Sequence, residues 1–447
     1  MNATFDLVLR GGTLVTHDGI AAGDIGVRDG RIVAVGDIGS TAAAETIDAT
    51  GLHVLPGVID TQVHFREPGN EHKEDLEAGS RGAVLGGVTA VFEMPNTSPL
   101  TTNAGALEDK LQRAHGRMWC EHAFYVGGTA ENAEDLAELE RLPGCCGVKI
   151  FMGSSTGDLL TPDDESLRRI LRGSRRRCAV HAEDEERLIA RKHLAEAAAD
   201  PSAHPDWRDV ETAFKATRRL IALARETAHP VHVLHITTAD EMRFLAEQKD
   251  IASVETTPQH LTLAAPDCYA ELGSRAQMNP PIRDAGHREG LWWGVQQGVV
   301  DVIGSDHAPH TLEEKAQTYP ASPSGMPGVQ TLLPLLLDHV HAGRITLNRL
   351  MDLMCAGPAR LFGLIGKGRI AVGYDADFTL VDLAARREIT DKMMANRSGW
   401  TPFHGREVTG WPMLTVIRGR VVMRDGALIG TAGGRPLRFI DTLQAQA

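Results

Sequence analysis

The chain has 447 residues, of which 42% are hydrophobic and 23% are charged. These proportions are ordinary for a globular protein, and the length is enough for one large domain and a smaller one. The formal net charge of -13 argues against a general nucleic-acid-binding protein, which normally presents a basic face.

The N-terminal sequence MNATFDLVLRGG lacks the basic start and apolar stretch of a targeting signal. No segment approaches the roughly 18 consecutive apolar residues that span a membrane. The six cysteines are scattered, and we expect them to be reduced, buried thiols. These features predict a cytoplasmic protein that has neither a membrane nor a nucleic acid as its partner.

Short alternating runs broken by glycine and Asp-Gly pairs occur at both ends of the chain. Near the N-terminus they are FDLVLRGGTLVT and GDIGVRDGRIVAVGD, and near the C-terminus GRIAVGYDADFTLVDL and LTVIRGRVVMRDG. Such alternation between turn signals predicts β-hairpins. We therefore predict one small β-sandwich domain built from both ends. Residues 1–55 are its expected N-terminal part, and residues 366–447 are its expected C-terminal part and tail.

Residues 56–365 have a different rhythm, in which apolar runs of strand length alternate with helix-like stretches. The runs include GVTAVFEM, GCCGVKIFM and PVHVLHIT, and the stretches include DESLRRILRGSR and DVETAFKATRRLIALARETA. Short apolar strands separated by helices predict a parallel sheet that is covered on both faces. The number of such units favours an α/β fold of the (β/α)8 TIM-barrel type over an open doubly wound sheet.

Polar side chains follow these apolar runs repeatedly, at the strand ends where a barrel carries its chemistry. Taken singly, each has an ordinary structural explanation, such as a hydrogen-bonded histidine, an N-cap aspartate or a turn asparagine. His232 and His307 keep that explanation here. Several histidines, a lysine and an aspartate at successive strand ends instead favour a metal site. The residues concerned are His64, Arg66, Asn96, Lys149, His181, His235, His260, Asp306 and His310.

The mixture of imidazole and carboxylate groups suits Zn²⁺, which keeps an open position for water in catalytic sites. Lys149 is the unusual member, because a protonated ammonium repels a cation. It would serve as a ligand only if CO₂ carbamylated it, which would create an anionic carboxylate able to bridge two metals. The sequence does not show this modification. We infer it from the histidines and the aspartate that occupy the other strand ends.

Motif-like segments span most of the chain, namely DTQVHFREPG, EMPNTSP, GVKIFMGSSTG, HAEDEE, LHITT, TPQHL, MNPPIR and SDHAPH. Together they resemble the amidohydrolase superfamily, within it the cyclic-amide hydrolases, and most closely the dihydroorotases. The resemblance implies that Lys149 is a carbamylated bridge. His181 and His235 would hold one zinc ion, and His64 and Asp306 the other. Asp306 would also be the general base and acid.

The same resemblance implies how a small-molecule substrate is held. Arg66, Asn96 and His310 would bind its carboxylate, and Asn279 would help to hold a pyrimidine ring. The implied reaction is the reversible cyclisation of N-carbamoyl-L-aspartate to L-dihydroorotate in pyrimidine biosynthesis. A bound metal would activate the water and polarise the ring carbonyl. A homodimer is the expectation for the family.

Arg66 separates the subclasses of this family, because a guanidinium fork matches a carboxylate through two hydrogen bonds. Dihydroorotate carries a carboxylate on its ring, whereas hydantoin, dihydrouracil and allantoin do not. The structural alternative for Arg66 is a surface ion pair with Glu67 or Glu71. Allantoinase and dihydropyrimidinase or hydantoinase are the alternative enzyme activities.

Gln62 departs from the family pattern, in which most members carry His-x-His in the first strand. An amide oxygen is a weaker zinc ligand than imidazole. Gln62 either coordinates through its oxygen, stays unbound beside the ligands His64, Lys149 and Asp306, or leaves that second site weak or empty. Some dihydroorotase-like sequences carry glutamine in the same setting. Our hypothesis is an active enzyme with one firm zinc and a second, looser one.

A different class of function stays open, that of a non-catalytic dihydroorotase-like subunit of aspartate transcarbamoylase. It predicts a wider loss of ligands than the single change at Gln62. The loop at residues 311–328 is a candidate for closing over the substrate, with Gly325 offering backbone hydrogen bonds. His260 either supports the site from a neighbouring loop or packs against a strand end, and the sequence favours neither.

Overall fold

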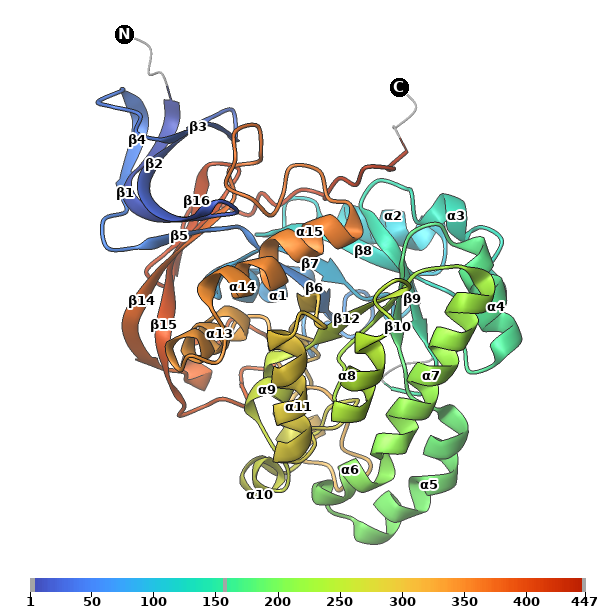
Figure 1. Cartoon of the computed structure of the whole chain (residues 1–447). Helices are drawn as coiled ribbons and strands as arrows, with labels where there is room; N and C mark the ends of the chain where they lie inside the picture. Colours follow the sequence, from blue (N-terminus) through green and yellow to red (C-terminus); the bar gives the residue numbers. More distant parts are fainter. Residues whose placement is uncertain (1–4, 156–158, 444–447) are drawn as a thin grey trace.

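The computed structural model describes residues 5–155 and 159–443. It contains an eight-stranded parallel sheet and a nine-stranded sheet drawn from both ends of the chain. In Figure 1 the parallel sheet is surrounded by helices, and the other sheet stands to one side in blue and red, the colours of the two chain ends. The predicted α/β class and the origin of the small β-domain are both confirmed.

The parallel strands pair in sequence order, as a (β/α)8 barrel requires. The first and last strands approach each other where the backbone N–H of His64 donates to the carbonyl of His307 at 2.7 Å, so the barrel is nearly closed. The strands are β6 (Val58–Val63), β7 (Val88–Glu93), β8 (Glu121–Gly127), β9 (Cys145–Phe151), β10 (Cys178–His181), β11 (Val231–Val233), β12 (Ala252–Thr256) and β13 (Val302–Ile303).

The barrel strands are buried on both faces, which explains why their sequences are apolar runs rather than alternating ones. Their outward side chains pack under the helices in one large core. Inside the barrel, Phe92 and Tyr125 pack in a second cluster with Phe362, and with Leu437 and Phe439 from the C-terminal tail. The tail also meets the amino end of β8, where the backbone N–H of His122 donates to the carbonyl of Arg435 at 3.1 Å, so it closes the amino end of the barrel.

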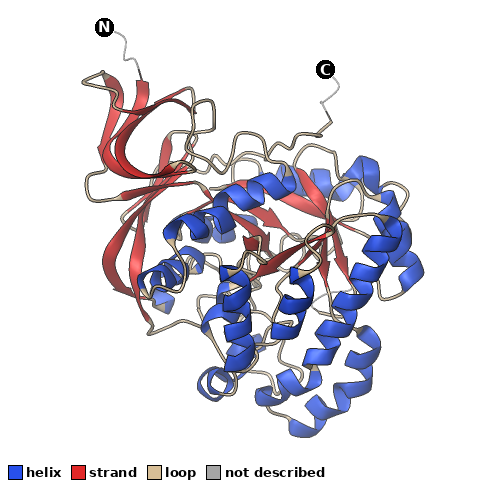
Figure 2. Cartoon of the chain, viewed as in Figure 1, coloured by secondary structure: helices blue, strands red, loops and turns tan. Residues whose placement is uncertain are grey.

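Helices cover the outside of the parallel sheet (Figure 2). Several begin directly after a capping aspartate or asparagine, such as Asp75, Asn103 and Asp209, whose side chain accepts a hydrogen bond from a backbone N–H of the first turn. The helices up to α7 are α1 (Leu76–Leu85), α2 (Ala104–Ala114), α3 (Leu136–Leu139), α4 (Asp164–Gly173), α5 (Glu185–Ala198), η1 (Pro201–Ala203), α6 (His204–Trp207) and α7 (Val210–Thr227).

The later helices complete the barrel shell, and none of the described helices has the length and apolar character that crossing a bilayer demands. They are α8 (Ala239–Ala246), α9 (Pro258–Thr262), α10 (Asp267–Leu272), η2 (Gly273–Ala276), α11 (Ala285–Gln296), α12 (Leu312–Lys315), α13 (Leu332–His341), α14 (Leu347–Met351), the π-helix η3 (Asp352–Ala356), α15 (Gly357–Phe362) and η4 (Asp391–Met393).

The second sheet encloses its own core of Leu, Ile, Val and Phe side chains, and Figure 1 shows it strongly curved. The strands from the N-terminal end of the chain join those from the C-terminal end where β5 pairs antiparallel with β14. The six cysteines are buried free thiols, as predicted. The strands are β1 (Phe5–Thr16), β2 (Gly19–Arg28), β3 (Arg31–Gly36), β4 (Ala43–Asp48), β5 (His53–Pro56), β14 (Phe378–Glu388), β15 (Glu407–Ile417), β16 (Arg420–Arg424) and β17 (Ala427–Leu428).

Candidate active site

A small cavity opens where the barrel strands end at their carboxyl termini. Most of the predicted site residues line it, although they come from strands that are far apart in the sequence. The lining residues are Gln62, His64, Arg66, Asn96, Phe151, Ser155, His181, His235, Asn279, Asp306, Ala308, Ser324 and Gly325. The cavity therefore gathers metal-type ligands and hydrogen-bond donors in one place.

The histidines that end β10 and follow β11 face each other. Nδ1 of His181 lies 3.0 Å from Nε2 of His235. Two nitrogens on one zinc ion, each about 2.0–2.1 Å from it at a tetrahedral angle, are roughly 3.3 Å apart. Nδ1 of His235 is buried and has no hydrogen-bond partner among the described residues. Burial lowers the pKa of both imidazoles, which leaves them neutral with lone pairs for a metal.

Glu183 fixes the orientation of His181 and was missed from the sequence. Its carboxylate accepts from Nε2 of His181 at 2.9 Å, so the other ring nitrogen carries the lone pair that faces His235. The single N–H at Nε of Arg208 is in turn shared by the two carboxylate oxygens of Glu183, each 3.1 Å from Nε. Arg208 holds the pKa of this buried carboxyl well below its ordinary value despite the opposing effect of burial. The HAED motif, with an acid two residues after the histidine, was the available signal.

His64, Asn96 and Asp306 form the opposite side of the cavity. Oδ1 of Asn96 accepts from Nδ1 of His64 at 2.9 Å. The remaining ring nitrogen, Nε2, lies 3.3 Å from a carboxylate oxygen of Asp306. Burial lowers the pKa of His64 to about 4, so the neutral ring presents a lone pair toward an anion. A cation between the two groups would relieve this contact between acceptors.

Gln62 occupies the position of the missing histidine. Its Nε2 donates to Oδ1 of Asp306 at 3.0 Å, whereas its Oε1 is buried without a partner among the described residues. The amide N–H therefore competes with a metal for Oδ1 of Asp306. The amide oxygen, Oε1 of Gln62, is itself free to bind a metal. This half of the site fits a cation less well than the half built from His181 and His235.

Lys149 lies in β9 beneath the cavity. Its Nζ is fully buried, lies 4.2 Å from the centre of the Phe151 ring and has no hydrogen-bond partner among the described residues. Burial lowers its pKa to about 7, although Asp306 and Glu255 oppose the shift. A large fraction of the side chain is then a neutral amine, the form that reacts with CO₂. The unpartnered amine thus fits carbamylation and the metal ligation that would follow.

Arg66 is a buried cation without a counter-ion of its own. It is 5% exposed, and no carboxylate of the described residues lies within ion-pair distance of its guanidinium. Its Nε donates to the carbonyl of Pro309 at 3.2 Å, and Nη2 lies 3.3 Å from Nε2 of His310. Glu67, one of the alternative partners considered from the sequence, pairs with Arg117 instead. A buried guanidinium at the cavity wall favours an anionic ligand there.

The other predicted residues lie at different depths. Asn279 lines the cavity, and its Nδ2 is 3.4 Å from Oγ of Ser155, a lining residue that the sequence did not single out. His310 lies behind Arg66, where its Nε2 is 3.1 Å from the carbonyl of Ser324. His260 is outside the cavity lining and bonds the carbonyl of Pro280 at 3.0 Å, so it supports the segment that carries Asn279.

Three residues of the site have a left-handed backbone, namely Arg66 (φ 63°), His235 (φ 36°) and Asp306 (φ 44°). Residues other than glycine adopt this conformation at a cost, and such strain concentrates at functional sites. The conformation turns each side chain away from the direction in which its strand runs. The barrel scaffold thus holds these side chains over the cavity against a local preference.

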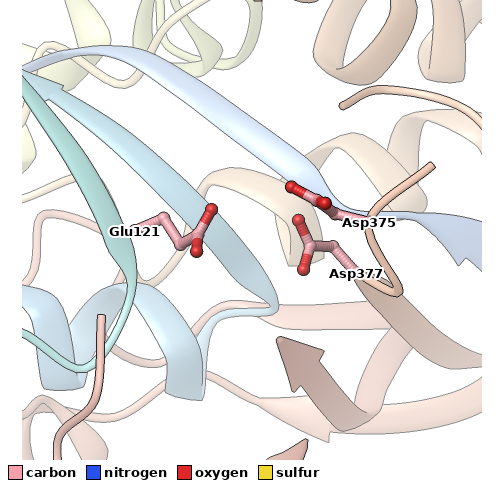
Figure 3. A group of neighbouring side chains, drawn as sticks. All are labelled: Glu121, Asp375 and Asp377. Carbon is pink, nitrogen blue, oxygen red and sulfur yellow. The ribbon is translucent and has the colours of Figure 1, made fainter. Parts of the chain in front are cut away.

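A second group of acidic side chains lies at the opposite end of the barrel, where Glu121, Asp375 and Asp377 converge (Figure 3). The ammonium of Lys367 contacts all three carboxylates, at 3.0 Å in the case of Asp375. Arg418 pairs with Glu121 and lies 3.5 Å from Asp375. The protein's own cations neutralise this cluster, so it fits a structural ion network rather than a metal site.

A (β/α)8 barrel that gathers imidazole, carboxylate and amine groups at the carboxyl ends of its strands is typical of metal-dependent hydrolases. A model of the amidohydrolase family matches residues 53–422. The chain belongs to this family.

Named relatives narrow the class further. The chain is 34% identical over 91% of its length to a dihydroorotase of Methanothermobacter thermautotrophicus, covering 92% of that protein. It is 33% identical over 97% of its length to an allantoinase of Deinococcus radiodurans, covering 99% of it. The solved structure of an L-hydantoinase (dihydropyrimidinase) from Arthrobacter aurescens matches with a TM-score of 0.93 and 31% identity, over 97% of this chain and all of that one. These matches place the chain among the cyclic amidohydrolases.

Proposed function

We propose that this protein is a zinc-dependent dihydroorotase, which interconverts L-dihydroorotate and N-carbamoyl-L-aspartate. The observation that carries the proposal is the buried guanidinium of Arg66, which has no carboxylate partner among the described residues and faces a cavity of metal-type ligands. A ring carboxylate on the substrate would supply the missing counter-charge. Hydantoin and allantoin have no such group, and they would leave a buried cation unpaired at a cost of several kcal/mol.

Zinc would be held firmly by His181, His235 and the carbamate of Lys149. His64 and Asp306 would share a second, weaker ion with that carbamate, because Gln62 already occupies one oxygen of Asp306. A bound zinc ion supplies the activation of water and the polarisation of the amide carbonyl. The carbamate forms when Nζ of Lys149 attacks the carbon of CO₂ and loses a proton.

The substrate would be oriented by residues on the opposite wall. The guanidinium of Arg66 would bind the ring carboxylate, with Asn96 and His310 beside it. Nδ2 of Asn279 would donate to a polar atom of the ring. This orientation would bring the scissile amide next to Asp306, so that little motion would be needed before proton transfer.

Asp306 would move the proton. Burial raises the pKa of the Asp306 carboxyl, but the hydrogen bond with His64 and the electrostatic effect of the basic groups His235, His64 and Lys149 hold it well below the ordinary value. The carboxylate is thus ionised at neutral pH and accepts a proton from the attacking water. It then delivers the proton to the ring nitrogen as the C–N bond breaks. In the biosynthetic direction the amide nitrogen attacks the side-chain carboxyl carbon, and one water leaves.

The first test is hydrolysis of L-dihydroorotate by metal-stripped protein that is titrated with zinc in the presence of bicarbonate. We expect activity that rises with zinc and saturates, with a break at one or two equivalents that reports whether the second site works. Faster turnover of allantoin or hydantoin than of L-dihydroorotate would identify that compound as the substrate instead. A zinc-loaded protein without activity on any of these would favour the non-catalytic subunit.

The Arg66→Lys variant tests the role of the carboxylate. Lysine keeps the positive charge and loses the two-pronged donor, so we expect kcat/KM for L-dihydroorotate to fall by about 10- to 100-fold. The exposed Arg172→Lys variant is the matched control. An equal fall for a cyclic amide without a carboxylate would show that Arg66 acts on the fold of the site rather than on the substrate.

A further inference from the structure

The segment that follows α12 forms one wall of the cavity through Ser324 and Gly325. From the sequence it was a candidate for a loop that closes over the substrate. Both backbone polar groups of Gly325 are already engaged: its N–H donates to the carbonyl of Gln277 at 2.8 Å, and its carbonyl accepts from Nζ of Lys315. A hydrogen bond from the Gly325 N–H to the substrate would require this wall to come apart.

Lys315 is a buried link within this wall, since only 1% of it is exposed. Its ammonium donates to the carbonyls of Gln277 at 3.3 Å, Pro323 at 2.7 Å and Gly325 at 3.0 Å. Burial lowers the pKa of Lys315 to about 7, but the protonated form has three N–H groups, and all three are satisfied by carbonyls that belong to two separate segments, which favours the ammonium. Removing the side chain would leave buried carbonyls unpaired, which is unfavourable because they lose their hydrogen bonds without gaining water.

A reciprocal pair of side-chain contacts strengthens the same junction. Oγ of Ser322 donates to Oε1 of Gln277 at 2.7 Å. Nε2 of Gln277 donates back to the carbonyl of Ser322 at 3.1 Å. Gln277 and Ser322 are each 2% exposed or less, so water competes little for these bonds. The segment 311–326 is therefore joined to residues 274–279 along its length rather than at one point.

His204, at the start of α6, connects this junction to the substrate side of the cavity. Its Nε2 lies 3.0 Å from Oδ1 of Asn279 and 3.3 Å from Oγ of Ser324. Its Nδ1 lies 3.2 Å from the hydroxyl of Tyr319. Contact with Oδ1 leaves the NH₂ group of Asn279 turned toward Ser155 in the cavity.

We propose that Lys315 is a positioning residue that clasps residues 311–326 to residues 274–279, so that the wall carrying Asn279, Ser324 and Gly325 is formed before substrate binds. The wall is then a fixed determinant of which ring fits, rather than a lid. The part of the proposal that concerns substrate affinity rests on the proposed dihydroorotase activity. The part that concerns the clasp does not.

Hydrogen exchange of the full-length protein without substrate tests the clasp directly. We expect the Gly325 amide to exchange at least about tenfold more slowly than a freely exposed amide, because its hydrogen bond opens only when the buried junction separates. Exchange at the rate of an unstructured amide, with protection appearing only when L-dihydroorotate is added, would establish a lid and overturn the proposal. The exchange rate without substrate is independent of whether L-dihydroorotate is the true substrate.

The Lys315→Met variant keeps a similar length and removes all three donors. We expect exchange to accelerate by at least about tenfold in both segments, 274–279 and 311–326, since tenfold corresponds to only 1.4 kcal/mol. KM for L-dihydroorotate should rise by about tenfold while kcat stays within about threefold, because the clasp places binding groups and not the reacting ones. Zinc content should not change.

Gln317→Ala, an exposed change in the same segment, is the matched control and should alter neither exchange nor KM. Ser322→Ala removes one bond of the junction and should move both quantities in the same direction by less, which keeps the test available if Lys315→Met does not fold. Faster exchange in 311–326 alone, with KM and residues 274–279 unchanged, would show that Lys315 anchors only its own loop and would overturn the proposal.

Discussion

Two groups of buried ionisable side chains occupy opposite ends of the barrel. At the amino end, Glu121 and two aspartates surround Lys367, and every charge meets an opposite one within the protein. At the carboxyl end, the amine of Lys149 and one nitrogen of His235 have no partner among the described residues. Arg66 likewise meets no carboxylate there. Burial alone is therefore no sign of function, whereas buried ionisable groups that meet no opposite charge among the described residues are candidates for binding an external group.

The same difference separates the two halves of the candidate metal site. Glu183 and Arg208 orient His181 and satisfy its outward nitrogen, which leaves the lone pair on Nδ1 of His181 facing His235. On the other side, Gln62 donates to Asp306 and so satisfies part of a candidate ligand internally. We infer that the half built from His181 and His235 binds metal more tightly, because more of its ligand atoms have free lone pairs.

The largest expected effect comes from Lys149→Met. Because the amine has no hydrogen bond to lose, the free energy of unfolding should not fall. Activity should drop by at least about a thousandfold, the factor that several kcal/mol of lost metal stabilisation gives. Zinc content by atomic absorption and a thermal unfolding curve separate the two effects, with exposed Lys192→Met as the control. A variant that keeps its activity would remove Lys149 from the metal site.

Lys367→Met should show the reverse pattern. It leaves Glu121, Asp375 and Asp377 buried without their ammonium, which typically costs about 3–5 kcal/mol in a buried ion network. We expect denaturant unfolding at a lower midpoint, with unchanged zinc content per folded molecule. Stability equal to that of Lys192→Met would show that the cluster is solvated. The proposed difference between paired buried charges at the amino end and unpaired groups at the carboxyl end would then be wrong.

Glu183→Gln should weaken metal binding by about 10- to 100-fold, as is usual when the carboxylate partner of a histidine ligand is removed. The loss arises because glutamine keeps the size of the side chain and loses the charge that fixes the ring of His181. Competition with a chromogenic chelator measures the affinity of the firm site without any assay of activity. Glu186→Gln, a change on the exposed surface of α5, should have no effect.

The smallest expected effect is the pH dependence of carbamylation, which tests whether the amine of Lys149 is buried and unpartnered. Burial lowers the pKa of Lys149 to about 7 from an ordinary value of 10.5, so the neutral form accumulates up to pH 7 and is nearly complete above it. At constant dissolved CO₂, the rate of carbamate formation in metal-free protein should rise about tenfold per pH unit below 7 and level off above it. ¹³C NMR with labelled CO₂ follows the product. A rate that keeps rising to pH 10 would indicate an ordinary, solvated lysine.

The order of strands and much of the cavity could be predicted from local patterns. Apolar runs of strand length mark the barrel, and the residue that follows each run falls at the carboxyl end of the sheet. This rule places His64, His181, His235 and Asp306 together without any knowledge of distances. It works because a parallel barrel brings all its strand ends to one rim.

Contacts between side chains that are far apart in the sequence could not be predicted from these patterns. Arg208 meets Glu183 from a helix-rich insertion, and Lys315 meets Gln277 across a gap of 38 residues. Nor did the strand-end rule show that His310 lies behind Arg66, against the carbonyl of Ser324. Such contacts depend on how connecting segments fold back over the rim, and side-chain periodicity carries no information about that.

By itself, the sequence determined the parallel barrel, the origin of the small domain in both chain ends, and the residue types at the rim, because strand period and strand-end position are local properties. Only the tertiary structure decided which of the buried charges are neutralised internally and which are left unpaired. Whether a buried charge is paired depends on how the barrel closes and on which loops meet over its rim. The unpartnered amine of Lys149 and the unpaired charge of Arg66 therefore became visible only once the barrel was closed.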